Sequence, residues 1–147
     1  MADIVIREMR EEDIRAVSLL EAENFSHPWR YEDFLDAYTK PHYLYYVADK
    51  DGEIVAVAGL IISFDEAEVV NVSVSARHRR EGIAGKLLTG LFEAGRERGV
   101  KEYVLEVRSG NAAAKALYEK AGFVKAGVSP GFYRDPKEDA FLYRLKG

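Results

Sequence analysis

The stretch from residue 67 to residue 109 constrains the fold of this chain more than any other part of its sequence. It reads AEVVNVSVSA, then the basic turn RHRREG, then apolar residues at helical spacing from about Ala84 to Arg98, then EYVLEVRS. The residue types predict a strand at each end, and the spacing predicts a helix between them. Two strands joined by one helix form a parallel pair with a right-handed crossover.

The rest of the sequence predicts antiparallel strands and further helices around this unit. KDG separates two β-rich runs, and Asp51-Gly52 supplies the positive φ that a hairpin turn needs. The other expected elements are strands at 4–9, 43–49, 53–64, 123–129 and 138–145, a proline and glycine loop at 130–137, and helices at 11–25, 31–38 and 112–122 with Asn111 as an N-cap. The predicted fold class is α/β: a mostly antiparallel mixed sheet with one parallel pair and helices on both faces.

Composition limits the chain to one domain and excludes several functions. A chain of 147 residues fits a single domain, residues 1–147. The formal net charge of −4 disfavours binding to nucleic acid or to an anionic membrane over the whole surface. There is no cysteine, which excludes a disulfide framework, a thiolate nucleophile and a cysteine-based metal site. The three histidines share no ligand spacing, so we expect no metal site.

The sequence also bears on localisation. The N-terminus MADIVIREMREEDI lacks the apolar run of a signal peptide, and no later stretch is long enough to span a bilayer. We therefore expect a soluble, cytoplasmic protein. The oligomeric state is left open by the sequence.

The turn before the predicted central helix is suited to bind a phosphate or a pyrophosphate. A strand that turns into a helix aims backbone N–H groups and the positive end of the helix dipole outward. Gly82 lets the backbone come close to a ligand, and Ala84 and Gly85 keep the first helical turn thin. Arg79 and Arg80 add positive charge. The alternative is a basic turn that is simply solvated.

Two common phosphate-binding motifs do not match this turn. A Walker loop needs Ser or Thr after its lysine, but Lys86 is followed by Leu87, and the GxGxxG spacing of a dinucleotide site is absent. ATP with magnesium and NAD are therefore both disfavoured as ligands.

The segment RREGIA at 79–84 resembles the Arg/Gln-x-x-Gly-x-Gly/Ala pyrophosphate loop of the GNAT family of N-acetyltransferases. The resemblance continues through NVSV, LEVRSGN, AAAKALYEKAGF and EDA, and through the N-terminal ENFSHPW, so it covers nearly the whole chain. Together these segments are similar to the RimI-like branch, which acetylates the N-terminal alanine of a ribosomal protein. The resemblance implies the GNAT fold, acetyl-CoA as cofactor, CoA as product and no metal.

The resemblance also implies where the cofactor lies. The backbone of Val72, Ser73 and Val74 would contact the pantetheine arm and the acetyl group, and Asn111 would contact the cofactor. A backbone N–H on the NVSV strand would polarise the thioester carbonyl if a β-bulge frees it from the ladder. The implied pyrophosphate loop consists of Arg79, Arg80, Glu81, Gly82, Ile83, Ala84 and Gly85.

Two positions depart from the pattern of this branch. Gly110 stands where the branch usually has serine, and Phe132 precedes Tyr133 where the branch often has two tyrosines. Because of the second departure, we expect the peptide preference of this chain to differ from that of the branch.

Glu106 is the candidate base for deprotonating the acceptor amine. It stands among apolar neighbours in YVLEVR, where desolvation would raise its pKa toward the working pH. The resemblance places the proton acceptor of the family at the same position. An ion pair with an arginine across the sheet is the alternative role, and the strand pattern is equally compatible with it.

Tyr118 is the candidate acid for the departing thiolate. Ala114, Leu117, Tyr118 and Ala121 share one helical face, which points the ring inward. A phenol with a pKa of about 10 can protonate a thiolate of comparable basicity. The resemblance gives Tyr118 the proton-donor role, and the alternative is an ordinary core aromatic.

Several aromatic and acidic residues are candidates for the acceptor side. Of the aromatic residues at 25, 29, 31, 132 and 133, we expect Trp29 and Tyr133 to line a peptide groove and the others to pack in the core. Acidic side chains could attract a cationic amine or simply be solvated. These are Asp65, Glu66, Glu68 and Glu138.

The residues and the resemblance together predict an acetyl-CoA-dependent N-acetyltransferase that transfers acetyl directly to the N-terminal α-amine of a protein. The resemblance implies a ribosomal protein as the acceptor. An α-amine, with a pKa of about 7.7 to 8.0, is easier to neutralise than lysine at about 10.4. One alternative keeps the fold and acetylates a polyamine, an amino acid or a lysine side chain. Another is a noncatalytic acetyl-CoA sensor, which would have no need of both Glu106 and Tyr118.

Overall fold

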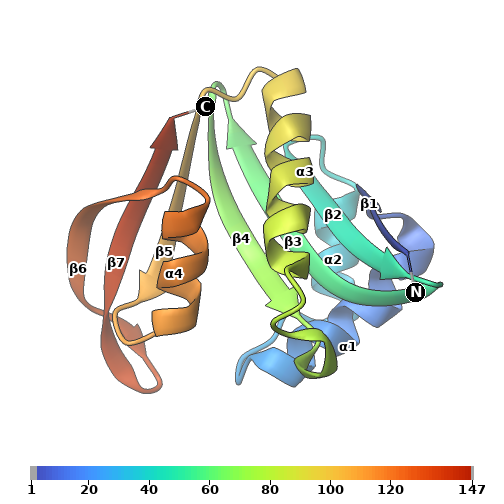
Figure 1. The fold of residues 1–147 in the computed structure, drawn as a ribbon, viewed down its shortest axis with the longest axis horizontal. Helices are drawn as coiled ribbons and strands as arrows, with labels where there is room; N and C mark the ends of the chain where they lie inside the picture. Colours follow the sequence, from blue (N-terminus) through green and yellow to red (C-terminus); the bar gives the residue numbers. More distant parts are fainter. Residues whose placement is uncertain (1–2, 147) are drawn as a thin grey trace.

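The computed structural model describes residues 3–146, which form a seven-stranded sheet with helices on both faces (Figure 1). The strand order is β1-β2-β3-β4-β5-β7-β6, and only β4 and β5 pair in parallel. The predicted fold class is therefore confirmed. The strands are β1 (Ile4–Glu8), β2 (Tyr43–Lys50), β3 (Glu53–Ser63), β4 (Glu66–Val74), β5 (Glu102–Arg108), β6 (Val124–Arg134) and β7 (Lys137–Lys146). The helices are η1 (Glu11–Asp13), α1 (Ile14–Asn24), α2 (Tyr31–Tyr38), η2 (Ala76–His78), α3 (Ile83–Glu97) and α4 (Ala112–Lys120).

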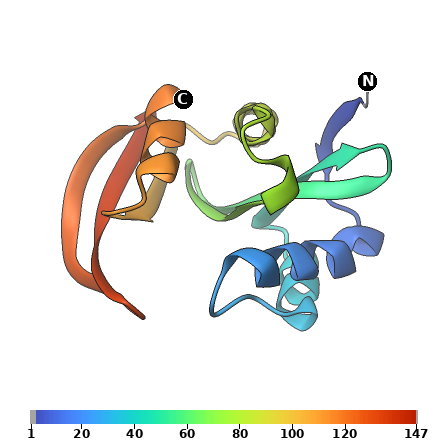
Figure 2. The same ribbon diagram turned by 60° about the horizontal axis from the view of Figure 1, so that its bottom comes forward.

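The sheet divides the core into two hydrophobic clusters, one on each of its faces. Figure 2 shows α1 and α2 on one face and α3 on the other. Ile14, Val17 and Phe34 are fully buried in the first cluster, and Leu87 and Leu91 in the second. No helix within residues 3–146 is long and apolar enough to cross a membrane.

The sheet opens where β4 and β5 diverge. The two strands pair only over Glu66–Glu68 and Glu102–Val104. Beyond that point β4 pairs only with β3 and β5 only with β7 within the described chain. Figure 1 shows the two strands separating toward the ends that lead into α3 and α4. Ligands of open α/β sheets bind at the carboxyl ends of such parallel strands.

A β-bulge lies in the diverging part of β4. Val70 pairs with Gly59 and Ser73 with Val57, so β4 has one residue more than β3 between these pairs. Asn71 takes up the extra length with a φ of 54°, in the left-handed region that asparagine tolerates better than most residues. The bulge that the resemblance implied in the NVSV strand is therefore present.

The C-terminal hairpin differs from the prediction. We expected a loop at 130–137, but β6 continues to Arg134 and the turn consists of residues 135–136. The pairing between β6 and β7 is irregular between Ser129 and Tyr133. Pro130 can occupy this strand because β6 is at the edge of the sheet, where a missing N–H breaks no ladder.

Candidate active site

The N-terminus of α3 faces open space. Gly82 is the N-cap residue with a φ of 75°, and no side chain of the described residues caps the helix. A Cβ atom on Gly82 or Gly85 would meet no atom of residues 3–146 within 4 Å. The first N–H groups of a helix have no partner within it, so this turn can accept an anion. The geometry fits the pyrophosphate group expected from the sequence.

The charged residues of this turn differ in whether they bond to other parts of the protein or remain exposed. Arg79 donates a hydrogen bond to Asn24 Oδ1 at the end of α1. Glu81 accepts a bond of 3.1 Å from Lys50, which is the main cause that lowers the pKa of this glutamate. The Glu81 side chain is thus engaged within the protein, and its backbone is the part left for a ligand. Arg80, with a φ of 65°, is exposed.

The edge of β4 that faces β5 provides backbone groups beside the opening. From Val69 to Val74 this edge has no strand partner within residues 3–146. Asn24 holds the end of the strand, because its Nδ2 donates to Ser73 Oγ at 2.5 Å and to Val74 O at 3.1 Å. The amide groups of an extended ligand, such as a pantetheine arm, could pair with this edge.

Glu106 lies at the base of the opening. It lines a cavity of about 330 Å³ together with Glu68 and Leu142. Glu106 is exposed overall, but partial desolvation at this cavity and the charge of Glu68 raise its pKa above the ordinary glutamate value. No ion pair to Glu106 forms within the described residues, because Arg144 pairs with Glu102 at 3.1 Å and with Glu66. The alternative role expected for Glu106, a cross-sheet arginine pair, is therefore not seen.

Tyr133 lies near Glu106, and Tyr118 lies near Tyr133. Tyr118 is 7% exposed and packs edge-on against Phe123, as predicted from its helical face. Burial, with a contribution from Tyr133, raises the pKa of Tyr118 to about 12. Burial and the charge of Glu106 also raise the pKa of Tyr133, whose ring lies 4.2 Å from the Arg108 guanidinium. Tyr133 is thus the residue that is coupled electrostatically to both catalytic candidates.

The remaining predicted residues fall in two places. Asn111 caps α4, since its Oδ1 accepts a bond of 3.1 Å from Ala114 N. Trp29 lies apart from Glu106 and packs at 5.2 Å against Phe34, between α1 and α2. A contact of 3.4 Å between His27 Nε2 and Asp135 Oδ2 links the loop that carries Trp29 to the β6–β7 turn.

One expectation for the acceptor side was wrong. Phe25 and Phe132, expected in the core, are 44% and 49% exposed, because they lie in a loop and in an edge strand. Glu138, for which attraction of an amine and simple solvation were both open, is bound by Arg108 at 3.2 Å and by Gly110 N at 2.7 Å, so its charge is locally compensated.

Three residues around the β4 bulge were not identified from the sequence. Glu21 and Asn24 continue the buried stripe of α1, and both reach β4 through hydrogen bonds. Asn71 has the unusual backbone conformation of the bulge. A signal existed for each, since polar residues at core spacing in a helix and asparagine within a strand are both unfavourable choices.

Comparison with known proteins agrees with this arrangement. The sequence profile of the acetyltransferase (GNAT) family matches residues 5–123. The chain is 32% identical to the [ribosomal protein bS18]-alanine N-acetyltransferase of Escherichia coli, over 95% of both chains, and 32% identical to the N-alpha-acetyltransferase RimI of Mycobacterium tuberculosis, over 96% of this chain and 91% of that protein. The crystal structure of the E. coli enzyme superposes with a TM-score of 0.89, covering 98% of this chain and 94% of that one. The chain therefore belongs to the GNAT family of acetyltransferases.

Proposed function

We propose that this protein is an acetyl-CoA-dependent enzyme that acetylates the N-terminal α-amine of a protein, with an alanine-initiated ribosomal protein of the bS18 type as acceptor. The similarity to relatives named for that activity supports the acceptor. The observation that carries the chemistry is the position of Glu106, an acid without a cation partner in the described chain, at the opening between β4 and β5.

Acetyl-CoA, when bound, supplies a thioester whose carbonyl carbon is open to attack by an amine. The α3 turn would hold its pyrophosphate through the N–H groups at Gly82, Ile83 and Ala84, with Arg79 and Arg80 adding charge. The free edge of β4 at Val72, Ser73 and Val74 would hold the pantetheine arm, and Asn111 would touch the cofactor from α4. In this site an N–H freed by the bulge would donate to the carbonyl oxygen.

Glu106 would take the proton that the amine must lose, acting through water. Its raised pKa makes it a stronger base than an ordinary glutamate. The neighbouring Glu68 adds negative charge, which favours approach of a cationic amine. Trp29 and Tyr133 would flank the acceptor on either side.

Tyr118 would stabilise the departing sulfur. As nitrogen bonds to the acetyl carbon, the carbon–sulfur bond breaks and its electron pair remains on sulfur. A hydroxyl with a pKa of about 12 is fully protonated at neutral pH and can donate a hydrogen bond to that thiolate. Because a thiol is more acidic than this hydroxyl, the two pKa values favour donation of a hydrogen bond over complete proton transfer.

The acceptor class can be tested with acetyl-CoA and two peptides, followed by intact-mass measurement. One peptide has a free N-terminal alanine and no lysine, and the other is N-terminally blocked with one internal lysine. We expect acetylation of the first peptide alone. Acetylation of the second alone would assign the enzyme to lysine or small-amine acceptors, and binding of acetyl-CoA without acetylation of either would identify a sensor.

A further inference from the structure

The last turns of α1 contain a buried carboxylate that the mechanism above does not use. Glu21 is 4% exposed, although glutamate is rarely buried without a cation. No arginine, lysine or histidine of residues 3–146 pairs with it. Its Oε1 is buried without a hydrogen-bond partner in the described chain. Such a group destabilises the fold, and proteins keep unfavourable groups of this kind mainly at functional sites.

The second oxygen of Glu21 joins two segments that are far apart in the sequence. Glu21 Oε2 accepts a hydrogen bond of 3.2 Å from the backbone N–H of Trp29, in the loop between α1 and α2. The same oxygen accepts one of 3.1 Å from Asn71 Nδ2, at the bulge of β4. Asn71 in turn accepts a bond of 2.8 Å from the Tyr45 hydroxyl. One carboxylate oxygen therefore connects the candidate acceptor loop to the candidate cofactor strand.

The bulge is the part of β4 where a small displacement matters most. Asn71 has a φ of 54° and precedes Val72, the first residue of the proposed cofactor-binding edge. Its side chain is held on both sides, by Glu21 and by Tyr45. The left-handed conformation is less favourable for asparagine than for glycine, so these bonds help to keep the backbone in this conformation.

We propose that Glu21 is a positioning residue that couples the β4 bulge to the acceptor loop at Trp29, so that binding of the cofactor along β4 also orders the acceptor site. The inference rests on the proposed function for its kinetic consequence. Glu21 touches neither reactant and acts through Asn71 and the Trp29 backbone. A site coupled in this way would favour binding of acetyl-CoA before the acceptor.

Trp29 offers a direct probe, because it is the only tryptophan of the chain. Its emission, measured with and without saturating CoA, reports on the acceptor loop without any acceptor present. We expect CoA to shift the emission of the wild type. Glu21→Leu, which removes the acceptor oxygen, and Asn71→Gly, which permits the positive φ but removes the amide, should each abolish most of the shift. Asn71→Gly also serves if Glu21→Leu fails to fold.

Two further variants separate positioning from charge. Glu21→Gln retains an oxygen that can accept both bonds, so it should keep more than half of the shift. Glu23→Gln is the matched control on the same helix, since Glu23 is exposed and, within residues 3–146, bonds only to Ala76 N at the start of η2. It should respond like the wild type. Every emission shift is measured at a CoA concentration that saturates the variant in question, because Glu21 and Asn71 hold the β4 edge proposed to contact the cofactor.

The kinetic arm uses the alanine-initiated peptide. Glu21→Leu should raise the peptide KM about tenfold, and Glu21→Gln should restore it to within threefold of the wild type. An unshifted wild-type emission, an equal shift in wild type and Glu21→Leu, or a peptide KM unchanged by Glu21→Leu would each overturn the proposal. If the wild type acetylates neither peptide, the proposed function fails, while the fluorescence arm still tests the coupling.

Discussion

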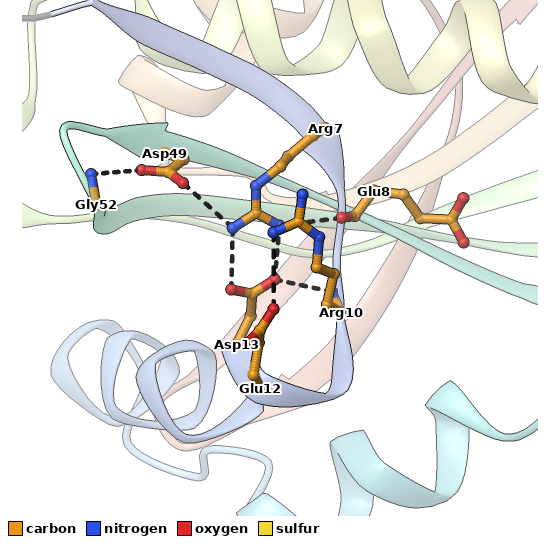
Figure 3. Close-up of polar contacts among 7 residues, drawn as sticks. All are labelled: Arg7, Glu8, Arg10, Glu12, Asp13, Asp49 and Gly52. Atoms are coloured by element: carbon orange, nitrogen blue, oxygen red, sulfur yellow. Dashed lines mark hydrogen bonds and ion pairs between the residues drawn. The ribbon is translucent and has the colours of Figure 1, made fainter.

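Two regions of the molecule treat acidic side chains in opposite ways. At the junction of β1, η1 and the β2–β3 hairpin, the Arg7 guanidinium lies between Asp13 and Asp49 (Figure 3). It donates to both oxygens of Asp13, at 2.7 and 3.0 Å, and to Asp49 at 3.2 Å. At the opening between β4 and β5, Glu106 has no cation partner within residues 3–146.

The pKa values follow from these surroundings. Burial alone would raise the pKa of Asp13, but the hydrogen bonds from Arg7 and from Arg10 N outweigh it, and the pKa is lowered. Burial and Glu68 raise the pKa of Glu106. An acid neutralised by its own chain stabilises the fold, whereas an acid left without a cation is available to a substrate. Variants in the two regions should therefore affect different measurements.

The largest effect is expected for Tyr118→Phe, which should lower turnover about 10²-fold or more. The Tyr118 hydroxyl donates no hydrogen bond to the described residues, so the melting temperature should change little. Steady-state rates with the alanine-initiated peptide test the first point, and thermal unfolding tests the second. A loss of stability as large as that expected for Arg7→Met would contradict the distinction between the two regions.

In the other region, Arg7→Met should destabilise the fold by about 2–3 kcal/mol, because it leaves Asp13 buried without its partner. The corresponding fall in melting temperature is roughly 5–10 °C for a chain of this size. CoA affinity should be unchanged. Arg10→Met is the control, since the Arg10–Glu12 pair is 3.6 Å long and largely exposed, and such pairs contribute about 0–1 kcal/mol.

Two glycines of α3 extend the comparison to the cofactor site. Gly85→Ala should raise helix stability by up to about 1 kcal/mol, because a Cβ there meets no described atom, but it should weaken CoA binding several-fold. Gly90→Ala should instead destabilise the fold and leave CoA binding unchanged, because its Cβ would lie 2.7 Å from Ile6 Cγ2. Calorimetric titration and thermal unfolding of both variants provide the check. Equal CoA affinity in the Gly85→Ala and Gly90→Ala variants would contradict the placement of the cofactor at the α3 turn.

The smallest effects concern pH. The lowered pKa of Asp13 gives stability that is present above its unfolded value and lost as the pH falls. The raised pKa of Glu21, caused by burial, has the opposite sign, so its contribution declines as the pH rises above the unfolded value of about 4.5. Asp13→Asn should therefore be more costly at pH 7 than at pH 4, and Glu21→Gln less costly. Denaturant unfolding at the two pH values would show whether the differences have these signs.

The sequence predicted those features that depend on local patterns. The parallel pair, the glycine at the start of α3, the N-cap at Asn111 and the inward ring of Tyr118 all follow from spacing and residue type. Pro130 was misread as part of a loop, because the sequence does not say that β6 is an edge strand.

Long-range contacts at the site could not be predicted in the same way. The Glu21–Asn71 bond joins residues 50 positions apart, and the His27–Asp135 pair joins two loops from opposite ends of the chain. The divergence of β4 and β5 depends on how far their pairing extends, which their residues alone do not specify. The chemistry of Glu106 was predicted from its apolar neighbours, but the absence of a cation partner within residues 3–146 required the structure.

The pH dependence of kcat/KM for the wild type and for Glu106→Gln, with the alanine-initiated peptide, shows whether Glu106 acts as the base. Without a base, only the fraction of acceptor that is already neutral can react, and that fraction rises as the pH passes the amine pKa of about 8. The wild-type rate should therefore exceed that of Glu106→Gln about 10²-fold near pH 6.5, and the ratio should fall at least tenfold by pH 9.5. A ratio that stays constant across this range, at any value, would contradict the assignment of Glu106 as the base.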